Sequence, residues 1–456
     1  MSHRTLRWLV GALAALWLCG EARHVVAAER KPNCVFVLVD DMGYADCGAY
    51  GAKDIRTPNI DRLAAEGVRM TDFYTAAPVC TPTRCAFITG RYQQRVGLEW
   101  ALGFTAEQKR RVGNEWVNEP DYKLLGLPVD SPSIARRMKE AGYATAIFGK
   151  WHLGYLPKYN PLEFGFDEYF GILLGHADFY SKLYKDGTYH LYEGTAPVKK
   201  EGYLTDLITD RAVEFIDRQA DHPFFLYVPY NAVHWPFQPP DRAEAMDPHD
   251  TYKGTRDDYR KMMERVDLSV GRLLESLERQ GVSDDTLIIF SSDNGGERLS
   301  DNAPLFNHKT TLWEGGIRVP CILRWPNGLP KGIVSSQPGI TMDLTATFAA
   351  AAGAPASKET PDGIDLLPIL RGEKPEVSRT FCWRVNRSDR KMKAVRHGDW
   401  KYVEDAMAPM LFNLKEDVGE RRDVGFMHPE ILAELRGLLE AWEADLAKSP
   451  PDFVVN

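Results

Sequence analysis

The chain has 456 residues, of which 44% are hydrophobic, and a formal net charge of −8. This length suits one large core plus a smaller unit, and the acidic balance excludes a general binder of nucleic acid or anionic membranes, which needs clustered Lys and Arg. After the N-terminal segment no stretch is long and apolar enough to cross a bilayer, so stable membrane insertion is not expected. If the substrate is anionic, positive charge must gather in one pocket.

The first 28 residues are typical of a signal peptide. Arg4 and Arg7 precede an apolar run over 8–18, and small residues follow up to Ala28. Predicted cleavage after Ala28 makes the protein an exported one, either periplasmic or secreted, and leaves six of the seven cysteines in the chain.

Strands and helices alternate from residue 34 to about residue 290. The continuous apolar run Cys34 to Val39 predicts a strand buried on both faces of a parallel sheet, in which Cys34 is a small buried hydrophobe. The alternation predicts an α/β fold with a large, mainly parallel central sheet sandwiched by helices. The expected strands are 34–39, 143–148, 224–228 and 286–290, and the expected helices cover 57–67, 131–142 and 259–280.

The alternation of strands and helices stops after about residue 370. Short strand-like segments separated by turns predict an antiparallel sheet, and Pro429 to Leu446 predicts an amphipathic helix. The expected organisation is a signal peptide over 1–28, a catalytic domain over 29–370 and a smaller C-terminal subdomain of antiparallel sheet plus helix over 371–456. The strand-like segments are 381–385, 392–396, 400–403 and 410–413.

Polar side chains follow three of the predicted strands. Because the carboxyl ends of strands line one crevice in an open α/β sheet, these side chains are expected to converge. Taken alone, each Asp or Asn pair is more often a strand-end turn, but their equivalent positions favour an oxygen-ligand site for a hard cation. Calcium or magnesium suits such a site better than zinc, and calcium is the predicted ion. The side chains are Asp40 and Asp41, Lys150 and His152, and Asp293 and Asn294.

The sharpest signal is the run Cys80-Thr81-Pro82-Thr83-Arg84. Thr81 can cap a helix and Pro82 can take its first position, which would put Cys80 at a helix N-terminus, where amide dipoles favour an anion. Arg84 lies one turn further and can reach back. A plain helix cap would explain Thr81 and Pro82 but neither Cys80 nor Arg84.

The sequence resembles the formylglycine-dependent sulfatases of the alkaline phosphatase superfamily, including arylsulfatases and N-acetylgalactosamine-6-sulfatases. The family signature Cys-x-Pro-Ser/Thr-Arg is present at 80–84 and continues as Thr89-Gly90-Arg91. The likeness extends over nearly all of the chain after the signal peptide and implies a sulfuric ester hydrolase with an alkaline phosphatase-like fold. Further similar segments, in family order, are 37–44, 57–61, 149–154, 309–320 and 411–420.

The resemblance implies the chemistry of the site. A formylglycine-generating enzyme would oxidise Cys80 to formylglycine, and the hydrated aldehyde would attack sulfur to give a sulfo-enzyme. One Ca²⁺ would bind residue 80 and the sulfate. With Cys80 set aside, five cysteines remain, so at least one thiol stays unpaired. The implied metal ligands are Asp40, Asp41, Cys80, Asp293 and Asn294.

The resemblance also implies a role for each cation and histidine. Arg84, Lys150 and Lys309 would surround the sulfate. His234, with Lys309, would protonate the departing alcohol, and His152 would take the proton whose loss expels sulfate. Without the resemblance, Lys309 would be interpreted as an exposed charge in a loop. His234 would equally be interpreted as a side chain that packs beside Trp235-Pro236. His308 is expected to support Lys309 without contacting substrate.

Two other functions are open at this level. One is a phosphodiesterase or phosphonate monoester hydrolase on the same fold, and the other is a non-catalytic, calcium-stabilised glycan-binding relative. The sequence offers ligands for one metal ion, which favours a sulfatase over the phosphodiesterase or phosphonate hydrolase. Cys80, Arg84 and Lys309 are all present, which favours a sulfatase over the non-catalytic glycan-binding relative. The aromatic and polar residues of Leu98 to Leu127 and Gly175 to Tyr180 are expected to form the rim, which suits a sulfated glycan or another sulfated small molecule.

Overall fold

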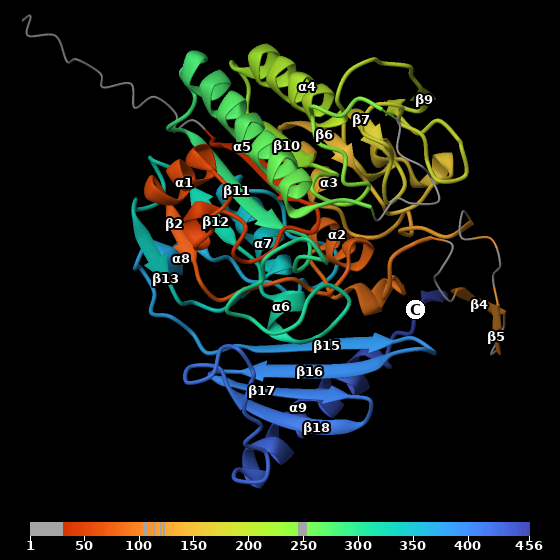
Figure 1. Cartoon of the computed structure of the whole chain (residues 1–456), viewed down its shortest axis with the longest axis vertical. Helices are drawn as coiled ribbons and strands as arrows, with labels where there is room; N and C mark the ends of the chain where they lie inside the picture. Colours follow the sequence, from red (N-terminus) through yellow and green to blue (C-terminus); the bar gives the residue numbers. More distant parts are fainter. Residues whose placement is uncertain (1–30, 104–107, 113–114, 119–120, 122–123, 245–252) are drawn as a thin grey trace, which may run out of the picture. The chain divides into compact units, whose positions relative to one another are not determined.

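Strand β1 (Asn33–Val39) lies at the centre of a ten-stranded sheet (Figure 1). It pairs in parallel with β11 (Thr286–Ser292) and β10 (Phe224–Pro229), and the parallel set continues through β6 (Ala144–Lys150) and β7 (Glu168–Ile172). All of β1 is buried, as its continuous apolar run predicts. The computed structural model describes residues 31–103, 108–112, 115–118, 121, 124–244 and 253–456; the predicted signal peptide lies outside them.

The two edges of the sheet contain the antiparallel strands. Beyond β11 the sheet runs antiparallel through β12 (Cys321–Arg324) and β2 (Val68–Met70), and β13 (Ile333–Ser335) then pairs in parallel with β2. Beyond β7, β8 (Tyr192–Glu193) and β9 (Ala196–Pro197) form an antiparallel edge. The prediction of a large, mainly parallel sheet is confirmed.

Helices cover both faces of the sheet (Figure 1). Val35 and Val37 of β1 pack in one core with α1, α4 and α5, whereas Phe36 and Leu38 pack in the other with α2, α3 and α7. This alternation along a strand buried on both faces is what its period of two dictates. The helices are α1 (Pro58–Ala65), α2 (Cys80–Thr89), α3 (Ile134–Glu140), α4 (Leu204–Gln219), α5 (Arg256–Arg279) and α7 (Thr341–Ala351).

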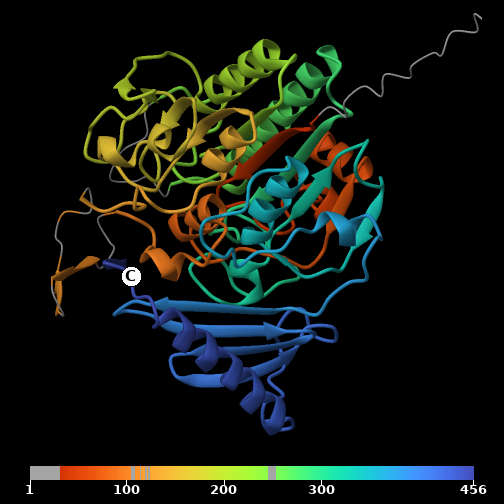
Figure 2. The ribbon, with the colours of Figure 1, turned by 180° about the vertical axis from the view of Figure 1, so that it is seen from behind.

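A four-stranded antiparallel sheet and a helix form the C-terminal part of the chain, and Figure 2 shows α9 lying across one face of that sheet. Leu435 and Leu439 of α9 pack on Val395 and Leu411, while Trp383 and Val403 face the main body. The predicted smaller antiparallel sheet and helix are confirmed, and the boundary at residue 370 stays a prediction. The elements are β15 (Thr380–Asn386), β16 (Lys391–His397), β17 (Trp400–Asp405), β18 (Ala408–Asn413) and α9 (Pro429–Leu446).

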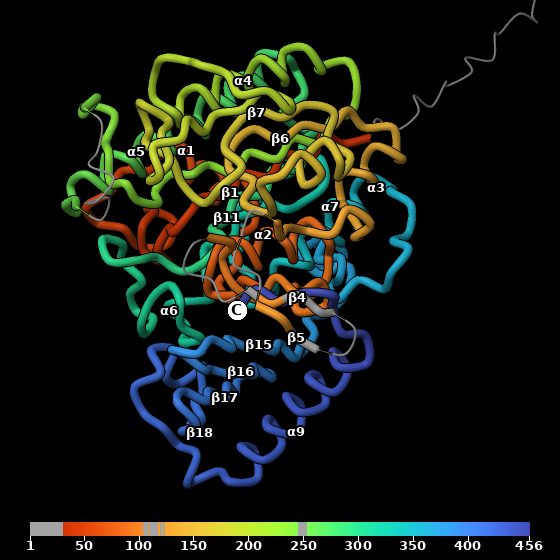
Figure 3. The backbone as a smooth tube through the Cα atoms, turned by 90° about the vertical axis from the view of Figure 1, so that its right-hand side faces the viewer, coloured from red at the N-terminus to blue at the C-terminus, as the bar shows by residue number. Residues whose placement is uncertain are grey.

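Short elements complete the described fold. The final strand, β19, pairs antiparallel with β4, so the chain ends beside the β4–β5 hairpin (Figure 3). No helix in the described ranges has the length and apolarity that a membrane span requires. The short elements are η1 (Gly48–Tyr50), η2 (Gln93–Val96), η4 (Pro157–Tyr159), η5 (Pro161–Phe164), α6 (Glu314–Ile317), α8 (Leu367–Leu370), β3 (Phe73–Tyr74), β14 (Gly339–Ile340), β4 (Gln108–Val112), β5 (Glu115–Asn118) and β19 (Phe453–Val455).

All cysteines in the described part of the chain are buried thiols, and none of them forms a disulfide there. Burial raises the pKa of the Cys34 and Cys85 thiols far above the usual value. Cys34 lies inside β1 as a small core residue, as expected. Cys80 differs from Cys34 because it is the first residue of a helix.

A buried ionic cluster joins the C-terminal sheet to the main body. Lys401 of β17 is fully buried, and its Nζ lies 2.7 Å from Glu314 Oε1 and 2.9 Å from Glu420 Oε1. Glu420 Oε2 accepts a hydrogen bond of 2.6 Å from the Glu314 backbone N–H. Burial raises the pKa of Glu420 to about 7, whereas Lys401 and Arg318 outweigh burial at Glu314 and lower its pKa to about 2. The cluster therefore depends on the Lys401 ammonium.

We expect Lys401→Met to cost about 3 to 5 kcal/mol in the free energy of unfolding, because it leaves buried carboxylates without their main cation. Denaturant unfolding followed by tryptophan fluorescence measures this loss. Lys448→Met is the control, because the Lys448 side chain is 74% exposed and its ion pair should contribute little. Equal stability of the two variants would contradict the role given to the cluster.

Candidate active site

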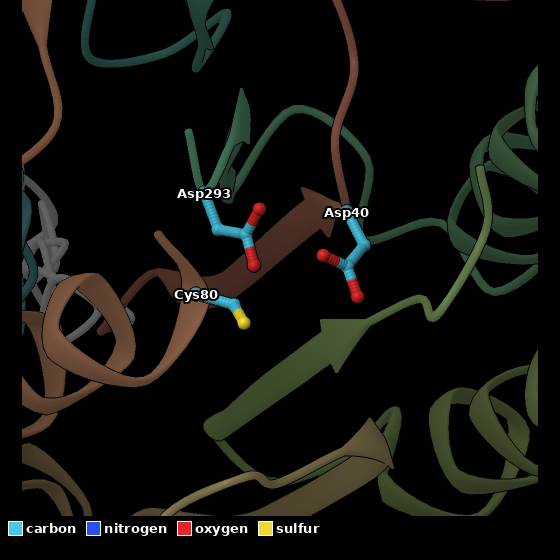
Figure 4. Close-up of side chains that lie close together, drawn as sticks. All are labelled: Asp40, Cys80 and Asp293. Atoms are coloured by element: carbon cyan, nitrogen blue, oxygen red, sulfur yellow. The ribbon is translucent and has the colours of Figure 1, made fainter. Parts of the chain in front are cut away.

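Residues far apart in the sequence converge at the carboxyl ends of the central strands. Asp40 directly follows β1 and Asp293 directly follows β11, and the Asp293 backbone N–H donates to the Val39 carbonyl at 3.1 Å. Figure 4 shows both carboxylates beside Cys80, at the start of α2. One ligand atom from each of these three residues lies within 4.8 Å of the other two. The predicted convergence at the strand ends is therefore observed.

Three buried cations pair with three buried carboxylates. Lys150 Nζ lies 2.5 Å from Asp40 Oδ2, and Lys309 Nζ lies 2.7 Å from Asp41 Oδ2. Arg84 donates to Asp293 Oδ2 from Nε at 3.0 Å and from Nη2 at 2.8 Å, and from Nη1 to the Lys150 carbonyl at 2.7 Å. Arg84 thus holds Asp293 in place, and its predicted contact with sulfate stays a prediction.

Burial and pairing move the pKa values of these carboxylates apart. Burial, then the neighbouring Asp293, raises the pKa of Asp40 well above its ordinary value. At Asp293 burial acts in the same direction, but Arg84, Lys150 and Lys309 outweigh it and lower the pKa. A shared positive charge near Asp40 would keep both carboxylates ionised.

The oxygen donors of the site fit a hard divalent cation. Asn294 Nδ2 donates to Asp41 Oδ1 at 2.7 Å and to the Gly295 carbonyl at 3.0 Å. Neither of these two hydrogen bonds uses the amide oxygen of Asn294. Asn294 Oδ1 and Asp40 Oδ1 are buried and have no hydrogen-bond partner among the described residues. Buried acceptors of this kind call for an ion or another donor. A set of carboxylate and amide oxygens is what calcium prefers.

Cys80 is the first residue of α2, and this corrects one detail of the sequence reasoning. The residue before the helix is Val79, and no side chain caps the end. The expectation that Thr81 caps this helix and Pro82 begins it is therefore wrong, because the helix starts two residues earlier, at Cys80. Cys80 Sγ lies 3.2 Å from His152 Nδ1. Burial raises the pKa of the Cys80 thiol although Lys150 and Lys309 oppose it.

The ring of His152 is held so that one nitrogen faces Cys80 as an acceptor. Its Nε2 lies 2.8 Å from the Leu102 carbonyl oxygen, so Nε2 carries the proton and Nδ1 in the neutral ring is free to accept. Burial, with the nearby Lys150, lowers the pKa of His152 well below its usual value. His152 is thus a neutral base beside Cys80.

The Thr81 side chain links the backbone at His152 to the backbone at Leu102, and these two residues determine how the His152 ring is held. Its hydroxyl donates to the His152 carbonyl at 3.0 Å and accepts from the Leu102 N–H at 3.1 Å. Sequence reasoning missed both the Leu102 carbonyl and this role of Thr81. A backbone carbonyl leaves no signal in residue type, so no local pattern identified it.

His234 comes a few residues after β10 and lies near the Asp41 carboxylate. It lies nearest to Oδ2 of Asp41, whereas Asn294 donates to Oδ1. Its Nε2 is 3.7 Å from Asp41 Oδ2, and its Nδ1 donates to the Trp235 carbonyl at 2.7 Å. Burial, then Lys309, lowers the pKa of His234. His308 is exposed and contacts the Lys309 carbonyl through Nδ1 at 2.9 Å, and its supporting role stays a prediction.

These side chains open into a pocket of about 640 Å³. Cys80, His152, His234 and Lys309 line it together with the expected rim residues, although parts of the 98–127 rim lie outside the described residues. Sequence reasoning did not assign several further lining residues, and four of these come from the loop after β11 and from the β15–β16 turn. The four are Glu297, Arg387, Asp389 and Arg390, and the aromatic members of the wall are Trp100, His176, Tyr184 and Trp235.

Comparisons with known proteins find similar proteins over most of the chain. A family model described as Sulfatase matches residues 32–354. The chain is 34% identical to N-acetylgalactosamine-6-sulfatase of Canis lupus familiaris, an alignment that covers 90% of this chain and 84% of that protein. The crystal structures of Ps i-CgsB, alone and in complex with k-i-k-neocarrahexaose, are 34% identical with a TM-score of 0.81, over 91% of this chain and 93% of theirs. PsFucS1 sulfatase from Pseudoalteromonas sp. is 26% identical, with a TM-score of 0.71 over 94% and 92%.

We expect Thr81→Val to cost about 2 kcal/mol in the free energy of unfolding, because it leaves a buried carbonyl and a buried N–H without their partner. The control is Thr205→Val on α4, whose buried hydroxyl has no hydrogen-bond partner among the described residues. Urea unfolding of both variants makes the comparison. Equal losses would show that the Thr81 bonds add nothing beyond packing.

Proposed function

The chain belongs to the sulfatase family, and we propose that it removes sulfate from a sulfated carbohydrate using a formylglycine made from Cys80 and a bound calcium ion. Hydrolysis of a sulfuric ester is the activity of its named relatives, and this chain is an enzyme of that class. The observation that carries the proposal is Cys80 beside the neutral base His152, among three buried cations and four oxygen-bearing side chains.

Asp40, Asp41, Asp293 and Asn294 are the proposed calcium ligands. Asp40 Oδ1 and Asn294 Oδ1 support this assignment, because both are buried acceptors that have no hydrogen-bond partner within the described part of the chain. When bound, the ion supplies positive charge that neutralises a sulfate oxygen and favours an anionic nucleophile. The buried positions of Arg84, Lys150 and Lys309 add further charge at the same point, which favours the transfer of negative charge to the sulfate oxygens.

Residue 80 is the proposed nucleophile, in its oxidised form. The thiol itself is poorly suited, because burial raises its pKa and sulfur is a soft partner for a hard cation. The hydrate of the aldehyde supplies a hydroxyl in its place. His152 Nδ1, 3.2 Å from the Cys80 sulfur, is placed to take the proton from a second hydroxyl at this carbon, which lets sulfate leave and restores the aldehyde.

His234 and Lys309 are proposed to serve the departing alcohol. Both line the pocket on the side of Asp41, and the pKa of Lys309 is raised because Asp41 and Glu297 outweigh its burial, so its ammonium remains charged. An incoming sulfate ester brings negative charge next to His234 and so favours its protonated form. The proton on Nε2 then becomes available to the leaving oxygen, because Nδ1 is already committed to the Trp235 carbonyl.

A carbohydrate is the proposed substrate class. The aromatic wall of the pocket offers faces on which sugar rings stack, and its histidines and carboxylate offer partners for hydroxyl groups. The names of relatives support the same class, one being an N-acetylgalactosamine-6-sulfatase and another being solved with an oligosaccharide. We also propose that the chain is exported and that a formylglycine-generating enzyme acts on Cys80 before it folds.

The purified enzyme is expected to release inorganic sulfate from 4-nitrophenyl sulfate and to prefer it to the matched phosphate diester. Mass spectrometry of the peptide with residue 80 should show a species lighter than the thiol. Cys80→Ala, which lacks any nucleophile, should lose activity by on the order of 10³-fold or more. Preference for the phosphate diester would replace the sulfatase by a phosphodiesterase, and absence of turnover with oxidised Cys80 would favour a glycan-binding protein.

Calcium is expected to raise the melting temperature, because an ion that binds only the folded state stabilises it by about 2.7 kcal/mol at 100 times its dissociation constant. Asn294→Leu, which removes an oxygen donor without changing the charge, should abolish most of this rise. Asp284→Asn, in the turn before β11, is the control and should keep it. Calorimetry with and without EDTA gives the comparison; an equal calcium response in both variants would place the ion elsewhere.

A further inference from the structure

The proposed calcium ligands lie at the start of two loops. The first loop, residues 40–47, follows β1, and the second loop, residues 293–302, follows β11. An ion bound by both loops requires a fixed spacing between them, because each ligand oxygen must lie within a narrow range of distances from the ion. Contacts within the protein that fix this spacing before the ion binds would favour binding.

Asp46 is a fully buried residue of the first loop that connects it to the second. The Asp301 backbone N–H donates to both oxygens of Asp46 at 3.1 Å, and the Ala45 N–H donates to the Asp301 carbonyl at 2.9 Å. Arg256 Nη1 of α5 lies 2.7 Å from Asp46 Oδ1, and Tyr259 Oη donates to Asp46 Oδ2 at 2.6 Å. All of these neighbours can donate, which suits an ionised carboxylate.

Asp46 also holds the backbone that follows Asp41. Asp41 has a φ of +62°, in the left-handed region that residues other than glycine rarely adopt, so its conformation needs support from its surroundings. The next two backbone N–H groups provide this support. The Met42 N–H donates to Ser292 Oγ at 3.1 Å, and the Gly43 N–H donates to Asp46 Oδ2 at 3.0 Å.

The contact at Asp301 reaches the ligands of the second loop through Asn302. Asn302 Oδ1 accepts from the Gly296 N–H at 2.9 Å, and Asn302 Nδ2 donates to the Gly296 carbonyl at 3.1 Å. Gly296 lies two residues after the last of the proposed ligands, and a Cβ at this position would lie 2.7 Å from the Gly43 Cα. The two loops are therefore in close backbone contact, and a change at Asp46 would affect both.

We propose that Asp46 is a positioning residue for the proposed calcium site and sets the spacing between the two loops before the ion binds. The inference rests on the proposed function, because it presumes that the four oxygen-bearing side chains bind calcium. Asp46 is not among the residues that line the active-site pocket, so it would act through Asp41 and Asp301. Groups that orient metal ligands in this way typically change metal affinity by about 10- to 100-fold when they are replaced.

Calorimetric titration with calcium chloride, after EDTA treatment and dialysis, measures the contribution of Asp46. The variant is Asp46→Asn, which keeps the size of the side chain but replaces one acceptor oxygen by an NH₂ group that faces other donors. We expect its calcium dissociation constant to rise by about tenfold or more. Denaturant unfolding in EDTA measures the stability of the same samples separately.

Asp267→Asn is the matched control. Asp267 is a buried carboxylate of α5 that accepts hydrogen bonds of 2.9 Å from the Asn59 and Ile60 N–H groups at the start of α1. This variant should lose stability but bind calcium as tightly as the wild type. Equal calcium dissociation constants for Asp46→Asn and Asp267→Asn would overturn the proposal, because Asp46 would then have only a structural role.

Tyr259→Phe decides the question if Asp46→Asn does not fold, because it removes only the hydroxyl that donates to Asp46. Weaker calcium binding than in Asp267→Asn supports the positioning role, and equal binding overturns it.

The wild type and Asn294→Leu separate this inference from the proposed function. Absence of calcium binding in the wild type would remove the proposed site and the role of Asp46 together. Calcium binding that is lost in Asn294→Leu but kept in Asp46→Asn would remove the positioning role alone.

Discussion

The structure depends on three carboxylates being held out of water at the carboxyl ends of the central strands. Removing such groups from solvent costs several kcal/mol each unless cations and hydrogen bonds replace the water. Arg84, Lys150 and Lys309 supply the cations, and all three are buried. Much of the local structure follows from this need: the position of α2 brings Arg84 to Asp293, and β6 ends where Lys150 reaches Asp40.

The C-terminal sheet contributes to the active site in two ways. Through Lys401 it anchors Glu314, which lies five residues after Lys309, so the loop with Lys309 is held by the sheet as well as by the main body. Through the β15–β16 turn it adds cations to the mouth of the pocket. The proposed catalytic groups come from the main body, whereas residues of this second sheet line part of the same pocket.

Local patterns in the sequence were sufficient for the elements that bear the site. The apolar run of β1 and the amphipathic pattern of α9 are found where expected, and the position of Asp40 and Asp293 after two parallel strands predicted that they meet. What local patterns lack is the direction of backbone groups and the pairing of distant loops. For this reason the Leu102 carbonyl and Arg390 were missed, and the start of α2 was misplaced by two residues. The helix α4, Leu204–Gln219, was also missed.

The central claim is that the four oxygen-bearing side chains hold a divalent ion next to residue 80. A crystal structure grown with calcium, with anomalous scattering data collected to identify the ion, tests it most directly. We expect one ion, about 2.3 to 2.6 Å from oxygens of Asp40, Asp41, Asp293 and Asn294 and in contact with residue 80. Anomalous density elsewhere, with Lys150 and Lys309 still paired to Asp40 and Asp41, would contradict it.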